Sequence, residues 1–239
     1  MSSPDNEVAK RIRRLGVRHL RGIVLLEGPR VIRQAVAAGV RLDVLALREG
    51  DELDVEADRT MVMSRALFNS LSTTESPQGA IAIGRSGPVE AGRALAAARS
   101  AGWPLVVLDG VQDPGNVGAI ARSAAAAGAV ALLVLPGSAD PFGPKAIRAS
   151  AGHVFHLTVA AGTWDDIAGL AKIGASAAGG PLAGGRLELA EALIFGSEAH
   201  GLSRDIPSVA LPMADGVDSL NVAAAAAILL YELRRLRSA

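Results

Sequence analysis

The residues best suited to chemistry lie between Asp109 and Asn116, where two aspartates, an asparagine, a proline and two glycines share eight positions. This loop follows the apolar run Leu105 to Leu108, which predicts a buried strand, and precedes the alanine-rich segment Val117 to Gly128, which predicts a helix. Such a unit brings a helix N-terminus to the carboxyl edge of a sheet, where open α/β proteins bind ligands. Arg122 falls about two turns into the helix and can reach back over the loop. The stretch is a candidate site for a phosphate or a nucleotide.

Strand–loop–helix units also occur without a ligand, and this loop matches neither the dinucleotide-binding pattern nor the P-loop pattern. Its chemistry alone leaves the structural and the phosphate-binding interpretations equally open. Two later stretches repeat the arrangement. The strand expected at Leu193 to Phe195 runs into Gly196 to Glu198, and a strand ending at Leu211 to Met213 precedes the loop Asp215 to Asp218. The sequence therefore predicts three strand-end loops at one edge of a parallel sheet.

Composition limits the possible classes of protein. The chain has 239 residues, 50% of them hydrophobic and 20% charged, which fits one large domain or two small ones and argues against disorder. Lysine plus arginine and aspartate plus glutamate each total 24, so any affinity for nucleic acid must come from local patches. There is no cysteine, and the four histidines lack metal-ligand spacing, so no metal is expected. With no signal peptide and no apolar run long enough to span a bilayer, we expect a cytoplasmic protein without membrane contact.

The first part of the chain alternates strand and helix patterns. Residues 6–21 form a basic arm with apolar residues at helical spacing, either a solvated helix face or a surface that tracks phosphates. The expected strands are Ile23 to Leu26, Leu42 to Leu47, Thr60 to Met63 and Gly79 to Ile83, and the expected helices are Pro29 to Ala38 and Arg65 to Leu71. This alternation predicts a small α/β domain of about 80 residues.

The glycine- and proline-punctuated segment Gly84 to Glu90 reads as a linker, so we expect domains at 1–84 and 91–239, joined by 85–90. The second domain is expected to contain helices at Ala91 to Ser100 and Pro144 to Ala151, a helix beginning near Thr163, and strands at Val130 to Leu135 and Ile173 to Ala175. Asp218 or Ser219 is a good N-cap for the last helix. Its first half, Val222 to Leu230, is apolar all round, which predicts burial between the sheet and a second subunit.

Three stretches resemble, in order and spacing, the signature motifs of the TrmH/SpoU branch of the SPOUT RNA methyltransferases: LDGVQDPGNVGAIARSAAAAG at 108–128, ALIFGSEAHGLS at 192–203 and LPMADGVDSLNVAAAA at 211–226. PKAIRASAG at 144–152 is also close to the family pattern. Leu26 to Pro29 and Ser76 to Gly79 resemble its N-terminal substrate-binding domain. The resemblance implies an α/β protein in which a small L30e-like domain precedes a parallel-sheet SPOUT domain with a deep trefoil knot.

The same resemblance implies transfer of a methyl group from S-adenosylmethionine to a ribose 2′-hydroxyl of RNA, by a homodimer joined through the knot and the last helix. The implied catalytic residues are Asn116, Arg122, Glu198, Ser219 and Asn221. Those implied to line the cofactor pocket are Leu135, Gly196, Leu211, Met213 and Leu220. The candidate RNA contacts are Arg18, Arg21, Arg30, Lys145 and Arg148, whereas Glu27 is expected to be structural.

Several alternatives stay open at this point. The substrate is expected to be 23S ribosomal RNA, with transfer RNA, a base acceptor, or a non-catalytic RNA-binding protein as alternatives. Arg122 is either a general base or, as we favour, a group that binds the target phosphate and stabilises the alkoxide, because a guanidinium is essentially never deprotonated in proteins. Ala199-His200 and Ala223 depart from the family pattern, and the first departure removes a cation near the site.

Overall fold

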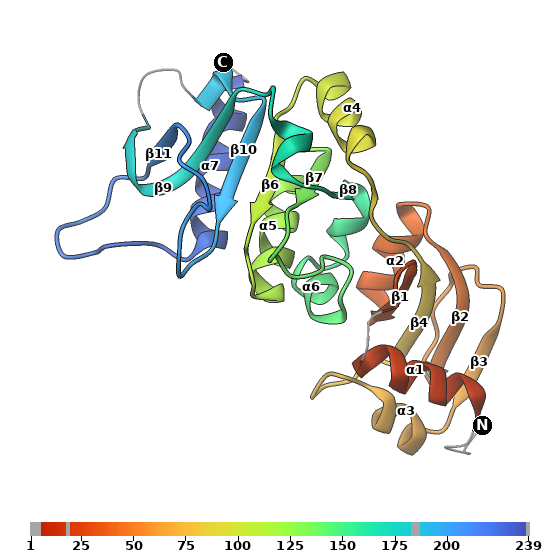
Figure 1. Ribbon diagram of the computed structural model, residues 1–239. Helices are drawn as coiled ribbons and strands as arrows, with labels where there is room; N and C mark the ends of the chain where they lie inside the picture. Colours follow the sequence, from red (N-terminus) through yellow and green to blue (C-terminus); the bar gives the residue numbers. More distant parts are fainter. Residues whose placement is uncertain (1–5, 18–19, 183–186, 238–239) are drawn as a thin grey trace.

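The computed structural model describes residues 6–17, 20–182 and 187–237, which form two sheets with helices around them (Figure 1). The smaller sheet has the strand order β1-β4-β2-β3. Its strands are β1 (Ile23–Glu27), β2 (Arg41–Arg48), β3 (Thr60–Met63) and β4 (Ala80–Arg85), and the helices beside it are α1 (Glu7–Val17), α2 (Pro29–Ala37) and α3 (Arg65–Leu71). β4 pairs antiparallel with β1 and β2, while β2 and β3 are parallel. The predicted small α/β domain is confirmed.

The basic arm forms helix α1, which packs one face against the small sheet. Val8, Ile12 and Leu15 are buried there with residues of α3, β2 and β4. Arg11 lies beside the apolar face of α1, and its guanidinium donates to the carboxylate of Asp43 on β2 at 2.9 Å. Asp43 also accepts from Arg85 of β4 at 2.7 Å, so this carboxylate joins the helix to two strands. The helical spacing of the apolar residues was therefore a correct indication of packing.

The larger sheet has the order β11-β9-β10-β6-β7-β8-β5, and every pair in it is parallel. Its strands are β5 (Val89–Glu90), β6 (Leu105–Asp109), β7 (Ala131–Val134), β8 (Thr158–Ala161), β9 (Lys172–Pro181), β10 (Ala192–Gly196) and β11 (Ser208–Ala210). The helices are α4 (Ala91–Ala101), α5 (Pro114–Ala127), α6 (Pro144–Ala149) and α7 (Val222–Arg237), with short 3-10 helices η1 (His153–His156), η2 (Trp164–Ile167) and η3 (Leu187–Leu189). The predicted parallel-sheet domain is confirmed, and the trefoil path of the chain stays a prediction.

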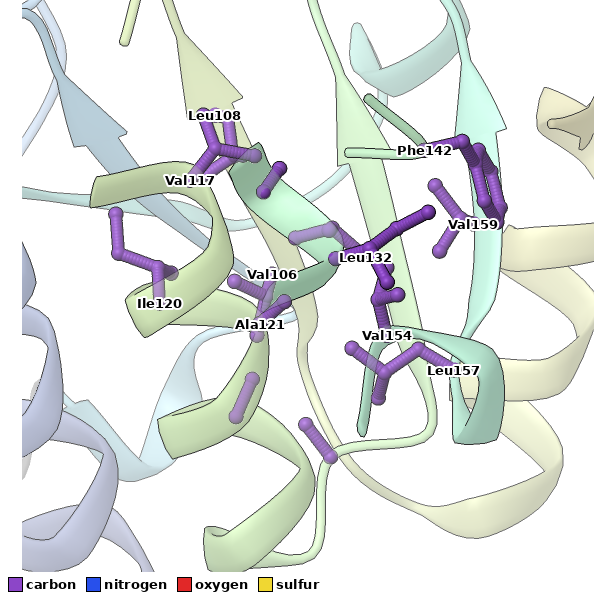
Figure 2. Packing of buried hydrophobic residues seen from close by; sticks show 14 of the residues in the cluster. Val106, Leu108, Val117, Ile120, Ala121, Leu132, Phe142, Val154, Leu157 and Val159 are labelled. Carbon is purple, nitrogen blue, oxygen red and sulfur yellow. The ribbon is translucent and has the colours of Figure 1, made fainter. Parts of the chain in front are cut away.

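Both faces of the larger sheet are buried, which explains the continuous apolar runs of its strands. Successive residues of a strand point to opposite faces. Val106 and Leu108 of β6 pack with α5, α6 and α7, as Figure 2 shows for part of this cluster, whereas Leu105 and Val107 pack with α4. Helices on both sides hold the carboxyl ends of β6 and β10 in fixed positions.

Local interactions fix where helix α5 begins and how closely it packs against α6. Asp113 caps it by accepting the backbone N–H of Asn116 at 3.0 Å, with Pro114 in the first turn. Gly118 permits close packing against α6, because a Cβ atom there would lie 2.2 Å from the carbonyl oxygen of Ala146. The first turn of α5 is thereby fixed between the sheet and α6.

Two details of the C-terminal region were predicted wrongly. β11 ends at Ala210, so Leu211 to Met213 follow the strand rather than end it. The N-cap of α7 is Asn221, whose Oδ1 accepts from the backbone N–H groups of Ala223 and Ala224 at 3.0 and 3.3 Å. Ile228 of α7 is 46% exposed in the single chain, so burial of the apolar half of this helix between the sheet and a second subunit stays a prediction. No helix within the described residues is long and apolar enough to cross a membrane.

The two sheets are joined by a tight, partly apolar junction rather than by a loose tether. One buried cluster includes Leu26 and Ile32 of the small domain together with Ile147 and Val154 of the large one. Arg85 is the last residue of β4 and Val89–Glu90 is strand β5, so residues 86–88 connect the two sheets. The domain limits 1–84 and 91–239 stay a proposal, with Arg85 paired in the small sheet and Val89–Glu90 in the large one.

Glu27, at the end of β1, joins this strand to the segment after α3 through its carboxylate. The residue is 8% exposed and accepts hydrogen bonds from Ser72, from the backbone N–H and hydroxyl of Thr73 at 3.2 and 2.6 Å, and from the hydroxyl of Thr74 at 3.1 Å. Burial alone raises the pKa of Glu27, but these hydrogen bonds outweigh it and hold the pKa below its ordinary value. The ionised form is therefore the one that the fold stabilises.

Replacing Glu27 with glutamine is expected to lower the free energy of unfolding by about 1–3 kcal/mol at pH 7. The side-chain NH₂ of glutamine would point at hydroxyl and backbone N–H groups that now donate to the carboxylate, so donors would face donors. Since the folded pKa is depressed, the wild-type carboxylate contributes stability above its unfolded pKa and loses it as the pH falls through the folded pKa. Urea unfolding should therefore show a gap between the two proteins at pH 7 that narrows below about pH 4. A gap that stays constant with pH would contradict this account.

Candidate functional site

A cavity of about 500 Å³ opens at the carboxyl edge of the larger sheet, beside the ends of β10 and β11. The segments around it are β9, the loop after β10, and the chain from β11 to the first turns of α7. Its lining residues are Ala175, Ser176, Ala177, Ala178, Gly196, Ser197, Glu198, Gly201, Val209, Leu211, Met213, Ser219, Leu220, Asn221, Val222, Ala225 and Leu229. Two of the three predicted strand-end loops therefore enclose one space.

The loop after β10 turns back closely on the strand. Ser197 and Gly201 exchange two backbone hydrogen bonds of 2.9 and 2.8 Å, and the Ser197 hydroxyl accepts from the backbone N–H groups of Ala199 and His200. A Cβ atom at Gly196 would lie 2.4 Å from the carbonyl carbon and oxygen of Gly201. Only glycine at position 196 allows this closed loop, which forms one wall of the cavity.

The third predicted loop joins the other two through a chain of amide contacts. The side-chain Nδ2 of Asn116 donates to Glu198, and Nδ2 of Asn221 donates to Oδ1 of Asn116 at 3.1 Å. Because Asn221 also caps α7, the network connects the starts of α5 and α7 with the end of β10. The structure thus brings Asn116, Glu198 and Asn221 together, and Ser219 lines the same cavity.

Two carboxylates hold the loops around this network. Asp109, which is 4% exposed at the end of β6, accepts from the backbone N–H and hydroxyl of Ser203 at 2.6 and 2.8 Å. Asp113 forms an ion pair with Lys145 at 2.7 Å. Lys145 and the backbone N–H of Asn116 hold the pKa of Asp113 below its ordinary value. Lys145 therefore lies beside the candidate site, while its RNA-binding role stays a prediction.

Arg122 lies on a different side of α5 from Asn116. Residues six apart on a helix differ in direction by about 120°. Arg122 is exposed and lies near His153 of η1, and it does not line the cavity. Within the part of the chain that the structure describes, its guanidinium has no hydrogen-bond partner. A single chain therefore leaves this cation open to solvent, available to an anionic group of the substrate.

The remaining candidate RNA contacts lie on the small domain and at its junction. Arg21 and Arg30 are exposed, the first in the turn before β1 and the second in the first turn of α2. Arg148 of α6 donates to the hydroxyl of Thr73 at 2.7 Å and lies 3.9 Å from the Glu27 carboxylate. Arg18 lies outside the described residues.

Among the predicted cofactor residues, Gly196, Leu211, Met213 and Leu220 line the cavity, whereas Leu135 is 2% exposed in the α4-side core and does not. The wall formed by Ala175 to Ala178 of β9 was not predicted from the sequence. The available signal was the run of small residues from Gly174 to Gly180, which leaves room for a ligand beside a strand.

The cavity fits the S-adenosylmethionine that the sequence implies. Its volume lies in the range that holds small organic ligands, and apolar side chains with a few polar groups line it, as such sites require. Its lining contains the carboxylate of Glu198 but no lysine or arginine among the described residues. That charge balance favours a positively charged sulfonium over a phosphate.

Comparison with known families and proteins agrees with this assignment. The sequence model of the SpoU rRNA Methylase family matches residues 104–231, and that of the MRM3-like substrate binding domain matches residues 6–82. The chain is 32% identical over 228 residues to the 23S rRNA (guanosine(2553)-2′-O)-methyltransferase RlmP of Bacillus subtilis, with 88% of each chain covered.

Two further proteins give the same result. The 23S rRNA (adenosine(1067)-2′-O)-methyltransferase of Streptomyces laurentii is 31% identical over 244 residues, which cover 91% of this chain and 89% of the relative. The crystal structure of the SpoU methyltransferase AviRb from Streptomyces viridochromogenes in complex with AdoMet superposes with a TM-score of 0.80 at 26% identity, covering 98% and 99% of the two chains.

Proposed function

Because the chain belongs to the SpoU rRNA methylase family and is an S-adenosylmethionine-dependent RNA 2′-O-ribose methyltransferase, we propose that it methylates a ribose of 23S ribosomal RNA. The support is that both relatives described above act on 23S rRNA and align over nearly their whole length. They act on different nucleotides, a guanosine and an adenosine, so the target position is a matter for experiment.

The single observation that carries the catalytic assignment is the Glu198–Asn116–Asn221 network beside the cavity. S-adenosylmethionine supplies a methyl group on a positively charged sulfur. We propose that Gly196, Leu211, Met213 and Leu220 hold it in the cavity. Asn116 and Asn221 then orient the ribose, and Glu198 fixes the amide of Asn116.

The acceptor hydroxyl is a weak nucleophile and acquires negative charge as it reacts, so it needs a stabilising group. Arg122 serves as that group by binding the phosphate of the target nucleotide, because its guanidinium is exposed and permanently charged. Ser219 lies at the cavity rim and helps to orient the ribose. Since the 2′-hydroxyl is absent from DNA, DNA is not a substrate.

The proposed substrate is tested with total RNA from a strain that lacks this gene. The RNA is incubated with the purified protein and tritiated S-adenosylmethionine and then separated by size. We expect the label in 23S rRNA. Label confined to the small RNA fraction would assign the enzyme to transfer RNA instead, and label confined to 16S rRNA would also contradict the proposal.

We also propose that the enzyme is a homodimer joined through α7. Ile228 and Tyr231 on this helix are 46% and 55% exposed, and Val217 and Leu220 in the preceding loop are 48% and 42% exposed. Apolar residues that gather on one helix and its leading loop are typical of a surface that another subunit covers. The same surface adjoins the cavity, so a second copy would help to enclose the site.

Replacing Ile228 with arginine is therefore expected to convert a dimer into a monomer, because a buried, unpaired charge is costly in an interface. Size-exclusion chromatography with light scattering measures the molar mass directly. Val62→Arg is the matched control, since Val62 is similarly exposed at 51% but lies on β3 of the small sheet. A monomeric wild-type protein, or an I228R variant that stays dimeric, would contradict the proposed interface.

A further inference from the structure

A second cavity lies between the two domains, away from the cofactor cavity. It measures about 570 Å³. Its lining residues are Glu27, Gly28, Arg30, Val31, Thr74, Glu75, Ser76, Gln78, Arg148 and Ala151, which come from the small domain and from α6 of the large one. We call it the interdomain groove. The network around Asn116 does not involve any of these residues.

One wall of the groove is fixed by close packing between the two domains. A Cβ atom at Gly152 would lie 2.8 Å from Cβ of Gln34 and 3.1 Å from the carbonyl oxygen of Val31, so α2 packs directly on the turn before η1. His156 of η1 and Gln34 of α2 share a hydrogen bond of 2.8 Å. The width of the groove is therefore set by packing and does not depend on a flexible tether.

Two arginines from different domains give the groove its charge. Arg30 is exposed in the first turn of α2, and Arg148 reaches the groove from α6. The contact of Arg148 with Thr73 uses one N–H of the guanidinium, which has five. Two carboxylates, Glu27 and Glu75, also line the groove. Glu27 accepts hydrogen bonds from Ser72, Thr73 and Thr74 and lies 3.9 Å from Arg148, so Arg148 is shared between this carboxylate and an incoming phosphate, and Arg30 is the cation on which the proposal mainly rests.

Polar groups that can hydrogen-bond to a nucleotide base lie beside these two arginines. Gln78 and Ser76 line the groove. The Gln78 amide lies over Gly28, where a Cβ atom would be only 3.0 Å from Gln78 Oε1. An amide offers both donors and an acceptor to the edge of a base. The space suits a single unpaired nucleotide, because proteins that recognise RNA by sequence mainly contact the exposed base edges of single-stranded segments, whereas the major groove of a duplex is too deep and narrow for side chains to read.

The groove is also connected to the methyl-transfer site by a row of cations. Burial lowers the pKa of His153, and the neighbouring His156, Arg122 and Arg30 lower it further, so both arginines lie within electrostatic range of this ring. Arg122 lies on α5. Lys145, which belongs to α6, forms an ion pair with Asp113, the residue that caps the start of α5. A phosphate backbone can thus follow positive charge from the Asn116 network to the interdomain groove.

From these contacts we propose that the interdomain groove binds an unpaired nucleotide of the substrate RNA near the target, with its phosphate between Arg30 and Arg148 and its base against Gln78. The inference rests on the proposed RNA substrate and adds to it a second binding site that selects the sequence or structure around the target. The groove then fixes the distance between that nucleotide and the methylated ribose.

The test compares Arg30→Glu with Arg33→Glu, because Arg33 is also exposed on α2 but does not line the groove. Binding to total RNA from a strain that lacks the gene is measured by filter retention at several salt concentrations. R30E is expected to weaken binding at least about tenfold and to reduce the salt dependence by about one phosphate contact, while R33E changes binding less. S-adenosylmethionine affinity should be unchanged in both.

Competition by short RNAs tests the single-stranded character of the site. We expect single-stranded RNA to displace the wild-type protein from total RNA better than a duplex of equal length, and R30E and Q78A to lose this preference. Equal effects of R30E and R33E, or equal competition by duplex RNA, would overturn the proposal. These experiments measure RNA binding and not methyl transfer. If the proposed 23S rRNA substrate is wrong, that failure would appear separately, as tritium label in another RNA in the methylation experiment.

Discussion

Replacing Arg122 with alanine is expected to lower kcat/KM for RNA methylation by about 10²–10³-fold and to leave S-adenosylmethionine affinity unchanged. The first effect follows from the proposed role of Arg122, in which its permanent positive charge binds the target phosphate and stabilises the negative charge of the acceptor. The second follows because Arg122 does not line the cofactor cavity. Methyl transfer to RNA and calorimetric titration of the cofactor measure the two quantities separately.

Arg122→Lys discriminates between the two roles that the sequence left open for this residue. A lysine keeps the charge but not the planar guanidinium, so a phosphate-binding, electrostatic role predicts activity between those of the wild type and of Arg122→Ala. Complete loss of activity in Arg122→Lys, with RNA and cofactor binding intact, would contradict a purely electrostatic role. Arg33→Lys is the matched control for a change of cation on an exposed helix face.

The second large effect is expected at Gly196, where alanine should weaken S-adenosylmethionine binding at least about tenfold. The added Cβ atom would meet backbone atoms of Gly201 at 2.4 Å, which cannot swing aside as a side chain can. Overpacking of this kind costs about 1–3 kcal/mol, and 1.4 kcal/mol corresponds to about tenfold in affinity. The wall of the cavity formed by residues 197–201 would have to move.

Gly169→Ala is the control for this prediction, since a Cβ atom there has no neighbour within 4 Å. Calorimetric titration with S-adenosylmethionine compares the two variants, and thermal unfolding reports whether G196A still folds. A G196A protein that folds and binds the cofactor with wild-type affinity would show that the loop after β10 does not form the cofactor site.

The fold was predictable where the sequence carries strong periodic patterns. The apolar runs at Leu105 to Leu108 and Leu193 to Phe195 identified central strands, because a strand buried on both faces needs no polar alternation. Asp113 and Pro114 marked the start of α5 through ordinary capping chemistry. The parallel pairing of the larger sheet agrees with the parallel-sheet domain that the family resemblance implied.

The details that failed depend on tertiary contacts. Asn221, rather than Asp218 or Ser219, caps α7, and its Nδ2 also donates to Asn116, a contact between residues 105 positions apart. The wall from Ala175 to Ala178 escaped notice because small residues carry no chemical signal of their own. The position of Arg122 relative to Asn116 follows from helix geometry, but only the packing of α6 and η1 shows which side each residue faces.

The most direct test of the central claim is a crystal structure of the protein with S-adenosylhomocysteine, the product form of the cofactor. We predict that the ligand occupies the cavity enclosed by β9, the loop after Gly196 and the chain from Val209 to Val222. The Asn116 network would then lie at its edge. A ligand bound elsewhere, such as in the interdomain groove, with that cavity empty, would contradict the assignment of the active site.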